Sequence, residues 1–254
     1  MGTERETKLK KLAHWLKDGG IVVFTGAGIS TESGLSDFRS PGGIWERFNP
    51  ADFTLQKFNS SAERRRKYWA FYRENWKVSR GAKPNRAHLA LAELEKMGKI
   101  NAIVTQNIDG LHQAAGSSPE KVYEIHGTMW EVSCLSCGDT TPWEEIYKIL
   151  EEDKEVENCH QCGGLLKPAT VSFGQSLPAG VLAEAQRQCG SCDLLLCIGS
   201  SLAVYPAAGL PEIAKNAGKK LVIINREPTP LDGVADLTFR GEAGEVMSQV
   251  LELM

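Results

Sequence analysis

The stretch IVVFTGAGIS, residues 21–30, decides the fold class. Five apolar or β-branched residues are followed at once by Gly26 and, two positions on, by Gly28. A strand without a polar face is typical of a parallel sheet that helices cover on both sides. Glycines at its end let the backbone approach a pyrophosphate and offer amide N–H groups. The stretch predicts a buried strand with a nucleotide at its carboxyl end, although a turn that only needs glycine would look the same.

Three further stretches repeat this pattern: NAIVTQNID (101–109), LLLCIGSS (194–201) and LVIIN (221–225). Apolar residues recur at helical spacing between them, and glycine ends two of these helical runs. Strands that alternate with helices indicate an α/β fold with a doubly wound parallel sheet. The small or hydrogen-bonding residues at all four strand ends favour a nucleotide crevice. The usual GxGxxG fingerprint is absent, because Thr31 stands where its third glycine would be.

Two segments interrupt the alternation of strands and helices. Residues 36–83 are rich in aromatic residues and arginine, with helical stretches and no predicted strand. Residues 134–167 carry paired cysteines and the acidic helical stretch PWEEIYKILEEDKEVE, residues 142–157. We interpret these segments as a smaller domain inserted into the sheet domain.

The cysteines of the second segment predict a metal site. Two CxxC pairs separated by 21 residues have the pattern of a four-thiolate zinc site, with the ligands Cys134, Cys137, Cys159 and Cys162. Four thiolates leave no open position, so the zinc should be structural. Glycines after each pair should turn backbone N–H groups toward the sulfurs. A third pair, Cys189 and Cys192, leads into a core strand and should hold no metal, and Cys197 within that strand should be a buried small apolar residue.

A single histidine, His126, lies eight residues before the first of these cysteines. It could be a zinc ligand, a satisfied core or surface histidine, or a general base. Because four thiolates already complete the tetrahedral site, His126 is not needed as a zinc ligand. An imidazole with a pKa near 6.5 suits proton transfer at neutral pH. The residues alone leave the core and catalytic interpretations open.

The charge balance narrows the classes of partner. The net charge of −3 gives no global attraction for nucleic acid or for an anionic membrane. No run of about 18 apolar residues predicts a transmembrane helix. The N-terminal stretch MGTERETKLKKLAHWLKDGG lacks the apolar region of a signal peptide. We expect a cytoplasmic protein whose cysteines bind metal and form no disulfides.

Several motifs taken together resemble those of the sirtuins, the NAD-dependent protein deacylases. They occur in the family's order, from residue 19 to about residue 244: GAGIS, DFRS, KPNRAH, TQNIDGLH, HG, two CxxC pairs, FG, GSSLAVYPAA, and IN followed by PTP. Each motif alone is weak, but the set is highly specific. Leu35 and Ser36 stand where the family usually has Ile-Pro, and Gln175 where it often has Glu.

The resemblance implies a Rossmann-like NAD-binding domain formed by residues 1–35, 84–130 and 168–254. It implies a small domain formed by the helical insert 36–83 and the zinc-binding module 131–167. One structural zinc per chain and NAD as a co-substrate belong to this arrangement. The expected partner is an acyl-lysine protein or peptide, and the expected state is a monomer.

The resemblance also assigns roles to single residues. Catalysis would fall to His126 and Asn107. The NAD site would be lined by Gly26, Ala27, Gly28, Ser30, Asp37, Phe38, Arg39, Gln106, Asn107, Ile108, Asp109, Gly199, Ser200, Ser201, Asn225, Arg226, Glu227 and Ala243. The substrate peptide would add as a strand between segments that contain Val171, Phe173, Gly174 and Val204.

The implied reaction consumes NAD and transfers no hydride. The acyl-lysine oxygen attacks the ribose carbon as nicotinamide leaves, and His126 takes a proton from the ribose hydroxyls. The products are free lysine, nicotinamide and acyl-ADP-ribose.

The expected acyl preference follows from the spacing of two residues in the helical segment after DFR. Family members that prefer acidic acyl chains, such as succinyl, carry Tyr and Arg three residues apart in the helical segment after DFR. Here Tyr72 is followed at that distance by Asn75. A buried carboxylate without a cation is costly. We predict deacetylation well above desuccinylation, unless Arg65 or Arg66 reaches the pocket.

Two other functions would fit parts of this sequence. An NAD dehydrogenase with a structural zinc would use the same crevice, but the broken GxGxxG and the missing acidic residue about 20 positions on argue against it. A zinc-ribbon module that binds nucleic acid without catalysis is disfavoured by the acidic stretch inside the zinc segment. Nicotinamide release that depends on an acylated peptide would distinguish the deacylase from the dehydrogenase. A DNA-binding assay would distinguish it from the nucleic-acid-binding module.

Overall fold

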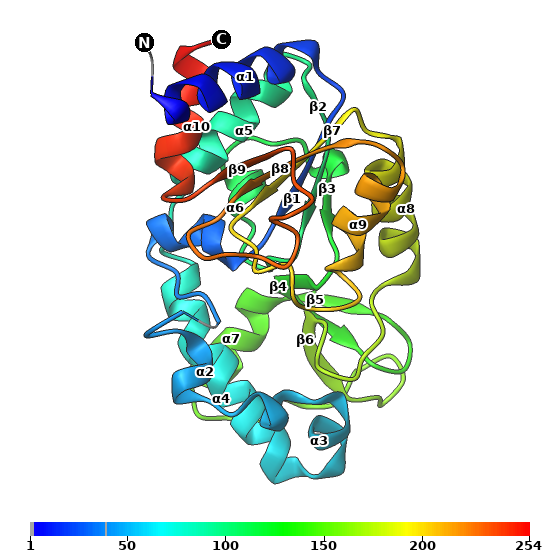
Figure 1. The fold of residues 1–254 in the computed structure, drawn as a ribbon. Helices are drawn as coiled ribbons and strands as arrows, with labels where there is room; N and C mark the ends of the chain where they lie inside the picture. Colours follow the sequence, from blue (N-terminus) through cyan, green and yellow to red (C-terminus); the bar gives the residue numbers. More distant parts are fainter. Residues whose placement is uncertain (1–2, 39) are drawn as a thin grey trace.

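The computed structural model describes residues 3–38 and 40–254 (Figure 1). The strands are β1 (Ile21–Thr25), β2 (Ile100–Thr105), β3 (Val122–Glu124), β4 (Gly127–Cys134), β5 (Thr140–Pro142), β6 (Leu166–Thr170), β7 (Leu194–Ile198), β8 (Lys220–Ile224) and β9 (Leu237–Phe239). The α-helices are α1 (Glu4–Asp18), α2 (Ile44–Arg47), α3 (Leu55–Ser60), α4 (Ala62–Ser79), α5 (Arg86–Lys96), α6 (Leu111–Ala114), α7 (Trp143–Glu151), α8 (Ala179–Ser191), α9 (Gly209–Asn216) and α10 (Ala243–Glu252). Short 3-10 helices are η1 (Ala27–Ser33), η2 (Pro50–Phe53) and η3 (Pro119–Lys121).

Six parallel strands form the larger sheet, in the order β3-β2-β1-β7-β8-β9. The four predicted strands are its four central members, so the predicted α/β sheet is confirmed. The chain runs outward from β1 to β3 and then restarts at β7 to run the other way. The switch point therefore lies between β1 and β7, where ligands bind in open α/β sheets.

Both faces of the larger sheet are covered, as the apolar strands require. Ile21 and Val23 pack into a cluster with α1, α5 and α10, whereas Val22 and Phe24 face a second cluster under α8 and α9. All four side chains are fully buried. Burying one such side chain contributes roughly 1.5–3 kcal/mol. Figure 1 shows the two helical layers on opposite sides of the sheet.

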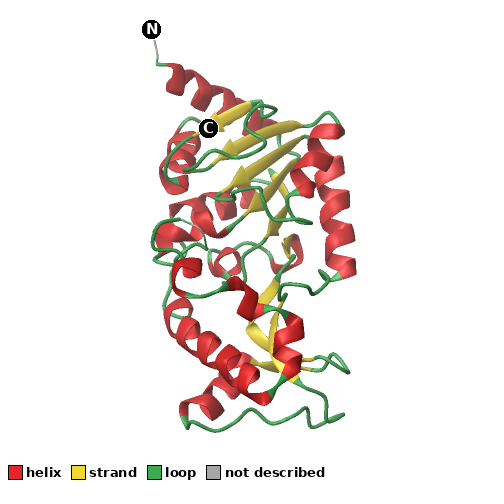
Figure 2. Ribbon diagram, turned by 60° about the horizontal axis from the view of Figure 1, so that its bottom comes forward, coloured by secondary structure: helices red, strands yellow, loops and turns green. Residues whose placement is uncertain are grey.

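A second, antiparallel sheet of order β5-β4-β6 lies at the opposite end of the molecule (Figure 2). It packs with α4 and α7 in a third hydrophobic cluster, where the rings of Trp69 and Trp143 stack 5.7 Å apart. Residues 36–83 therefore share a core with the cysteine-bearing segment, and we propose that the two form one small domain.

The small sheet is where the sequence was least informative. The acidic stretch 142–157 is helical only over Trp143–Glu151. None of the three small-sheet strands was predicted, because β4 exposes two adjacent residues and β5 has only three. The described residues of segment 36–83 form no strand, as predicted, and Thr54 makes only an isolated β-bridge with Phe173. In the described part of the chain, no helix is both long and apolar enough to cross a membrane.

Candidate active site and zinc centre

A cleft of about 870 Å³ runs from the switch point of the large sheet to the small sheet. Every described residue that the sequence assigned to NAD, to the peptide or to catalysis lines this one cleft. Arg39 lies outside the described residues. Residues from eight separate stretches of the sequence therefore meet at a single site.

The glycines at the switch point let two loops touch. The N–H of Gly28 donates to the carbonyl oxygen of Gly199 at 2.8 Å. A Cβ on Gly199, whose φ is +63°, would lie 2.1 Å from the backbone nitrogen of Ile29. A Cβ on Gly28 would lie 2.7 Å from the oxygen of Gly199. These glycines line the cleft, but the contact that requires them is between the loops after β1 and β7.

A buried polar network lies at the carboxyl ends of β1 and β2. The Oγ of Ser30 donates to Asp109 Oδ2 at 2.7 Å and accepts from Asn107 Nδ2 at 3.1 Å. Asp109 Oδ1 accepts from the N–H of Leu111 at 2.9 Å. Burial raises the pKa of Asp109, and these donated hydrogen bonds oppose the rise. The network fixes three polar side chains against the cleft before any ligand arrives.

Gln106 connects this network to His126. Its backbone N–H donates to Thr25 O at 3.0 Å, and its Nε2 donates to Ser200 Oγ at 2.8 Å. Its carbonyl oxygen lies 3.0 Å from His126 Nδ1. A carbonyl can only accept, so Nδ1 of His126 carries the proton. Gln106 thus links β1, β7 and the histidine in one rigid arrangement.

His126 is arranged to accept a proton. With the proton on Nδ1, the neutral ring has its lone pair on Nε2. Burial lowers the pKa of His126 from its ordinary value, and the hydrogen bond to Gln106 partly opposes this. The ring is therefore neutral at physiological pH. A half-buried neutral imidazole that lines the cleft is a competent general base.

The small-domain end of the cleft carries a pair of tyrosines, of which the sequence indicated Tyr72, through its spacing from Asn75, and missed Tyr68. Tyr68 OH lies 2.8 Å from Ser172 Oγ, and Tyr72 OH lies 2.7 Å from Thr170 Oγ1. Both rings are buried and stack on each other at 4.9 Å. The aromatic richness of segment 36–83 was the available signal, but it does not show which rings face the cleft.

Asn75 lines the cleft at this end, one helical turn after Tyr72. Its Nδ2 donates to Phe71 O at 2.8 Å. The two arginines left open by the sequence are engaged elsewhere: Arg65 donates to Phe58 O, and Arg66 pairs with Glu155. Neither lines the cleft.

An aromatic cover closes part of the cleft. Phe38, 36% exposed, packs 5.3 Å from Trp45, which lies 5.8 Å from Phe173. Phe173 also pairs with the insert through its backbone, accepting from Leu55 N–H at 3.0 Å and donating to Phe53 O at 3.2 Å. The helical insert, through α2 and the segment before α3, therefore meets the segment after β6 over the cleft.

The far end of the cleft is more exposed. Arg226 pairs with Glu242 at 2.6 Å, and both side chains are more than 40% accessible. Such a surface pair contributes little to stability. The N–H of Gly244, in the first turn of α10, donates to Glu32 Oε1 at 2.7 Å. This contact ties the loop after β1 to the helix that begins with Ala243.

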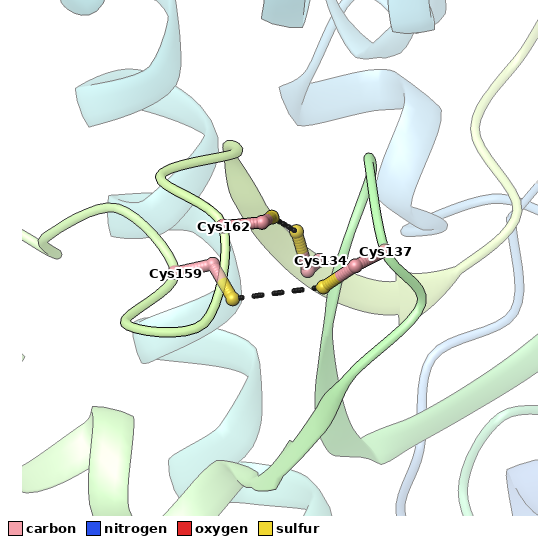
Figure 3. Close-up of side chains that lie close together, drawn as sticks. All are labelled: Cys134, Cys137, Cys159 and Cys162. Atoms are coloured by element: carbon pink, nitrogen blue, oxygen red, sulfur yellow. Dashed lines mark hydrogen bonds between the residues drawn. The ribbon is translucent and has the colours of Figure 1, made fainter.

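The four predicted cysteines form one compact cluster (Figure 3). Their sulfur atoms lie within 4.8 Å of one another, with Cys134 and Cys162 at 3.5 Å and Cys137 and Cys159 at 3.8 Å. Zn–S bonds of about 2.3 Å in a tetrahedron put the sulfurs about 3.8 Å apart. The residues present therefore fit a structural zinc, which would join the loop after β4 to the loop before β6.

The backbone around the sulfurs differs from the expectation in detail. Gly164 N–H points to Cys162 Sγ at 3.4 Å, as predicted, and Ser136 N–H points to Cys134 Sγ at 3.4 Å. Gly138 and Gly163 instead donate to the carbonyls of the first cysteine of each pair. Their positive φ values allow the tight turns that bring each pair of sulfurs together.

The other thiols and His126 do not join the metal cluster. Among the described residues, the group able to hold a metal contains only the four cysteines. Cys189 and Cys192 are buried, and burial raises the pKa of these thiols to about 12 and about 11. Cys197 is buried in β7. The interpretation of these three residues as buried thiols is confirmed.

Comparison with known proteins agrees with the site. The family model for the Sir2 family matches residues 26–206. An NAD-dependent protein deacetylase of Thermodesulfovibrio yellowstonii is 45% identical over 233 residues, covering 92% of this chain and 90% of the relative. NAD-dependent protein deacylase 2 of Archaeoglobus fulgidus is 43% identical over 249 residues, covering 97% and 96%.

Solved structures give the same result. A Sir2 complex with a p53 peptide and NAD+ is 40% identical, with a TM-score of 0.86 and coverage of 96% of this chain and 97% of that chain. A Sir2 complex with a deacetylated p53 peptide and 3'-O-acetyl ADP-ribose matches with the same identity, TM-score and coverage. From the cleft, the cysteine cluster and these matches, we conclude that the chain belongs to the Sir2 family.

Proposed function

We propose that this chain is an NAD-dependent protein-lysine deacylase that chiefly removes acetyl groups, with His126 as its general base. The observation that carries the proposal is the single cleft that brings together the switch-point loops, the Ser30–Asn107–Asp109 network and a neutral histidine whose Nε2 carries the lone pair. NAD supplies the ADP-ribosyl group that receives the acyl group as nicotinamide leaves.

The chain's own residues divide this work along the cleft. The loops after β1 and β7 would hold the phosphates, and Asn225 and Ala243 the adenosine end. Asn107 and Asp109 would meet the nicotinamide and its ribose, where His126 Nε2 would accept a ribose hydroxyl proton. The backbone of Phe173 and its neighbours would pair with the substrate peptide in β fashion.

The acyl group would lie at the small-domain end of the cleft. Tyr68 and Tyr72 have their hydroxyls engaged with Ser172 and Thr170, so they present a satisfied, largely apolar wall. Neither Asn75 nor the tyrosines supplies a cation for an acidic acyl chain. Burying an uncharged acetyl group carries no desolvation penalty comparable to that of a carboxylate.

We also propose that the enzyme acts as a monomer in the cytoplasm without binding nucleic acid. One chain supplies the entire cleft. Four zinc-binding thiolates must stay reduced, which suits the cytoplasm. The net charge of −3 offers no general attraction for a polyanion.

One incubation tests the proposal. The protein is mixed with NAD and an acetyl-lysine peptide, and nicotinamide, free-lysine peptide and acetyl-ADP-ribose are measured. Equal amounts of all three products, formed only when the acetylated peptide is present, are expected. Formation of NADH, or nicotinamide release that ignores the peptide, would instead support the dehydrogenase or a simple NAD hydrolase.

A further inference from the structure

Beneath the cleft, two buried histidines each have a ring nitrogen without a partner. His88 on α5 and His112 on α6 are 0% and 1% exposed, and their rings meet edge to face at 5.0 Å. Among the described residues, His88 Nε2 and His112 Nδ1 accept and donate no hydrogen bond. Burial lowers the pKa of His88 to about 4, and burial together with the neighbouring His88 lowers that of His112 to about 3. Both rings are therefore neutral near pH 7.

The hydrogen bonds of His112 fix its tautomer. Thr25 Oγ1 donates its only proton to Thr105 Oγ1 at 2.8 Å. It therefore accepts at its 3.0 Å contact with His112 Nε2. Nε2 of His112 must carry the ring proton, and Nδ1 is left as a bare acceptor.

The start of α5 fixes the other tautomer. The backbone N–H of Asn85 donates to His88 Nδ1 at 3.4 Å, which completes a capping box. A donor on Nδ1 is thereby excluded, so the proton of neutral His88 is on Nε2. The nitrogen without a partner on His88 is a donor, and the one on His112 is an acceptor. The two rings touch edge to face, with no hydrogen bond between these two nitrogens.

The far end of this chain of hydrogen bonds reaches the active site. Thr105 Oγ1 accepts from the backbone N–H of Asn107 at 3.0 Å. Thr25 O accepts from the backbone N–H of Gln106 at 3.0 Å. Gln106 is the residue whose carbonyl fixes the proton of His126. The turn after β2 is thus held from below by two threonines, one of which is held by His112.

We propose that His88 and His112 are positioning residues for the deacylation reaction. They form a neutral edge-to-face pair, each protonated at Nε2, in which His88 packs against the His112 ring that contacts Thr25. The pair orients Thr25 and Thr105 and thereby fixes the turn that carries Asn107. The kinetic part of this inference rests on the proposed function, whereas the tautomers do not.

The tautomers are tested by NMR of protein with 15N-labelled histidine rings. The chain has five histidines, so each signal is assigned by a single substitution. His88 and His112 should both show the neutral form protonated at Nε2 from about pH 5 to 8, whereas an ordinary histidine titrates within that range. A proton on Nδ1 of either ring, or titration near pH 6.5, would overturn the pairing even if the enzyme is an active deacylase.

The positioning role is tested by steady-state kinetics with NAD and an acetyl-lysine peptide. His112→Phe keeps a ring but removes the donor, and Thr25→Val keeps the shape but removes the hydroxyl. Each should lower kcat by about 3- to 10-fold, the value of one hydrogen bond, with little change in the KM of the peptide. Thr25→Ser, which restores the hydroxyl, should retain most of the wild-type kcat.

The double variant distinguishes positioning from a purely structural role. If the two residues act in one chain, Thr25→Val combined with His112→Phe should be no slower than the worse single variant. Multiplied losses, or a lower melting temperature with unchanged kcat, would refute positioning. If His112→Phe does not fold, the comparison of Thr25→Val with Thr25→Ser still decides whether the hydroxyl matters to kcat. No measurable deacylation by the wild-type protein would refute the proposed function and leave the NMR result standing.

Discussion

Replacing Gly199 with alanine should damage the protein far more than the same change at another glycine with the same backbone conformation. Gly199 has φ +63° and Gly218 has φ +73°. An L-residue in this conformation costs roughly 1–2 kcal/mol at either position. Only at position 199 does the new Cβ meet other atoms, 2.1 Å from the nitrogen of Ile29 and 2.5 Å from the carbonyl carbon of Gly28. Nothing lies within 4 Å at Gly218.

The clash sets the expected difference between the two variants. Overpacking costs about 1–3 kcal/mol. The upper half of that range applies because both neighbours are backbone atoms that cannot rotate away. At about 2–4 °C per kcal/mol for a chain of this size, Gly199→Ala should melt about 4–12 °C below Gly218→Ala. The KM for NAD should rise in Gly199→Ala alone, because the loops after β1 and β7 are forced apart.

Differential scanning calorimetry of the two variants and the wild type measures the first quantity, and nicotinamide release at varied NAD the second. Equal melting temperatures for Gly199→Ala and Gly218→Ala would show that the contact between the loops is not as close as described. A stable Gly199→Ala variant with a normal KM for NAD would refute the reasoning about the cleft as well.

Three other predictions address the metal, the base and the acyl group. Metal analysis should show that Cys134→Ser loses zinc, and with it the fold of the small domain, whereas Cys189→Ser retains one zinc per chain. The opposite pattern would show that this ligand assignment is wrong. His126→Ala should keep zinc and lower turnover by about 10² to 10⁴. Because the neutral ring is active and burial lowers the pKa of His126, wild-type kcat/KM should be flat near pH 7 and fall only well on the acid side of it, which a pH profile checks; a fall already at pH 7 would contradict this. The wild type should have a higher kcat/KM for acetyl than for succinyl peptides. Asn75→Arg should raise the rate of desuccinylation by about 10- to 100-fold, the value of a charge-assisted hydrogen bond. Asn75→Gln is the uncharged control, and an equal gain in that variant would refute the electrostatic explanation.

The sequence predicted the parts of the fold that local patterns determine. The four central strands are apolar throughout because both faces of the sheet are covered, and that pattern is readable without a structure. The edge strand β9 has three residues, too few for a pattern to be recognised. The cluster of four cysteines was predicted from spacing alone, since a tetrahedral site needs two close pairs of thiols.

The parts of the fold and site that depend on long-range contacts could not be predicted from the sequence. That Gly199 packs against Gly28 depends on which strands are neighbours, and no local signal gives strand order. The hydrogen bond from His126 to Gln106 joins residues 20 positions apart. This hydrogen bond places the ring proton on Nδ1 and leaves Nε2 able to act as a base. The histidine pair beneath the cleft has no sequence signal, because the helices that carry His88 and His112 meet only in the fold.

The shared core of the small domain also sets an order of events during synthesis. Trp69 and Tyr72 on α4 pack against Trp143 on α7, about 70 residues later in the chain. A ribosome that adds about 5–20 residues per second needs roughly 4–14 s to reach that partner. For this interval the newly made α4 has aromatic rings without their cover, while β1 of the large sheet is already made and β2 and β3 follow before α7. A nascent chain stalled in this interval would expose an apolar aromatic surface, so aggregation during expression should depend on translation speed between α4 and α7.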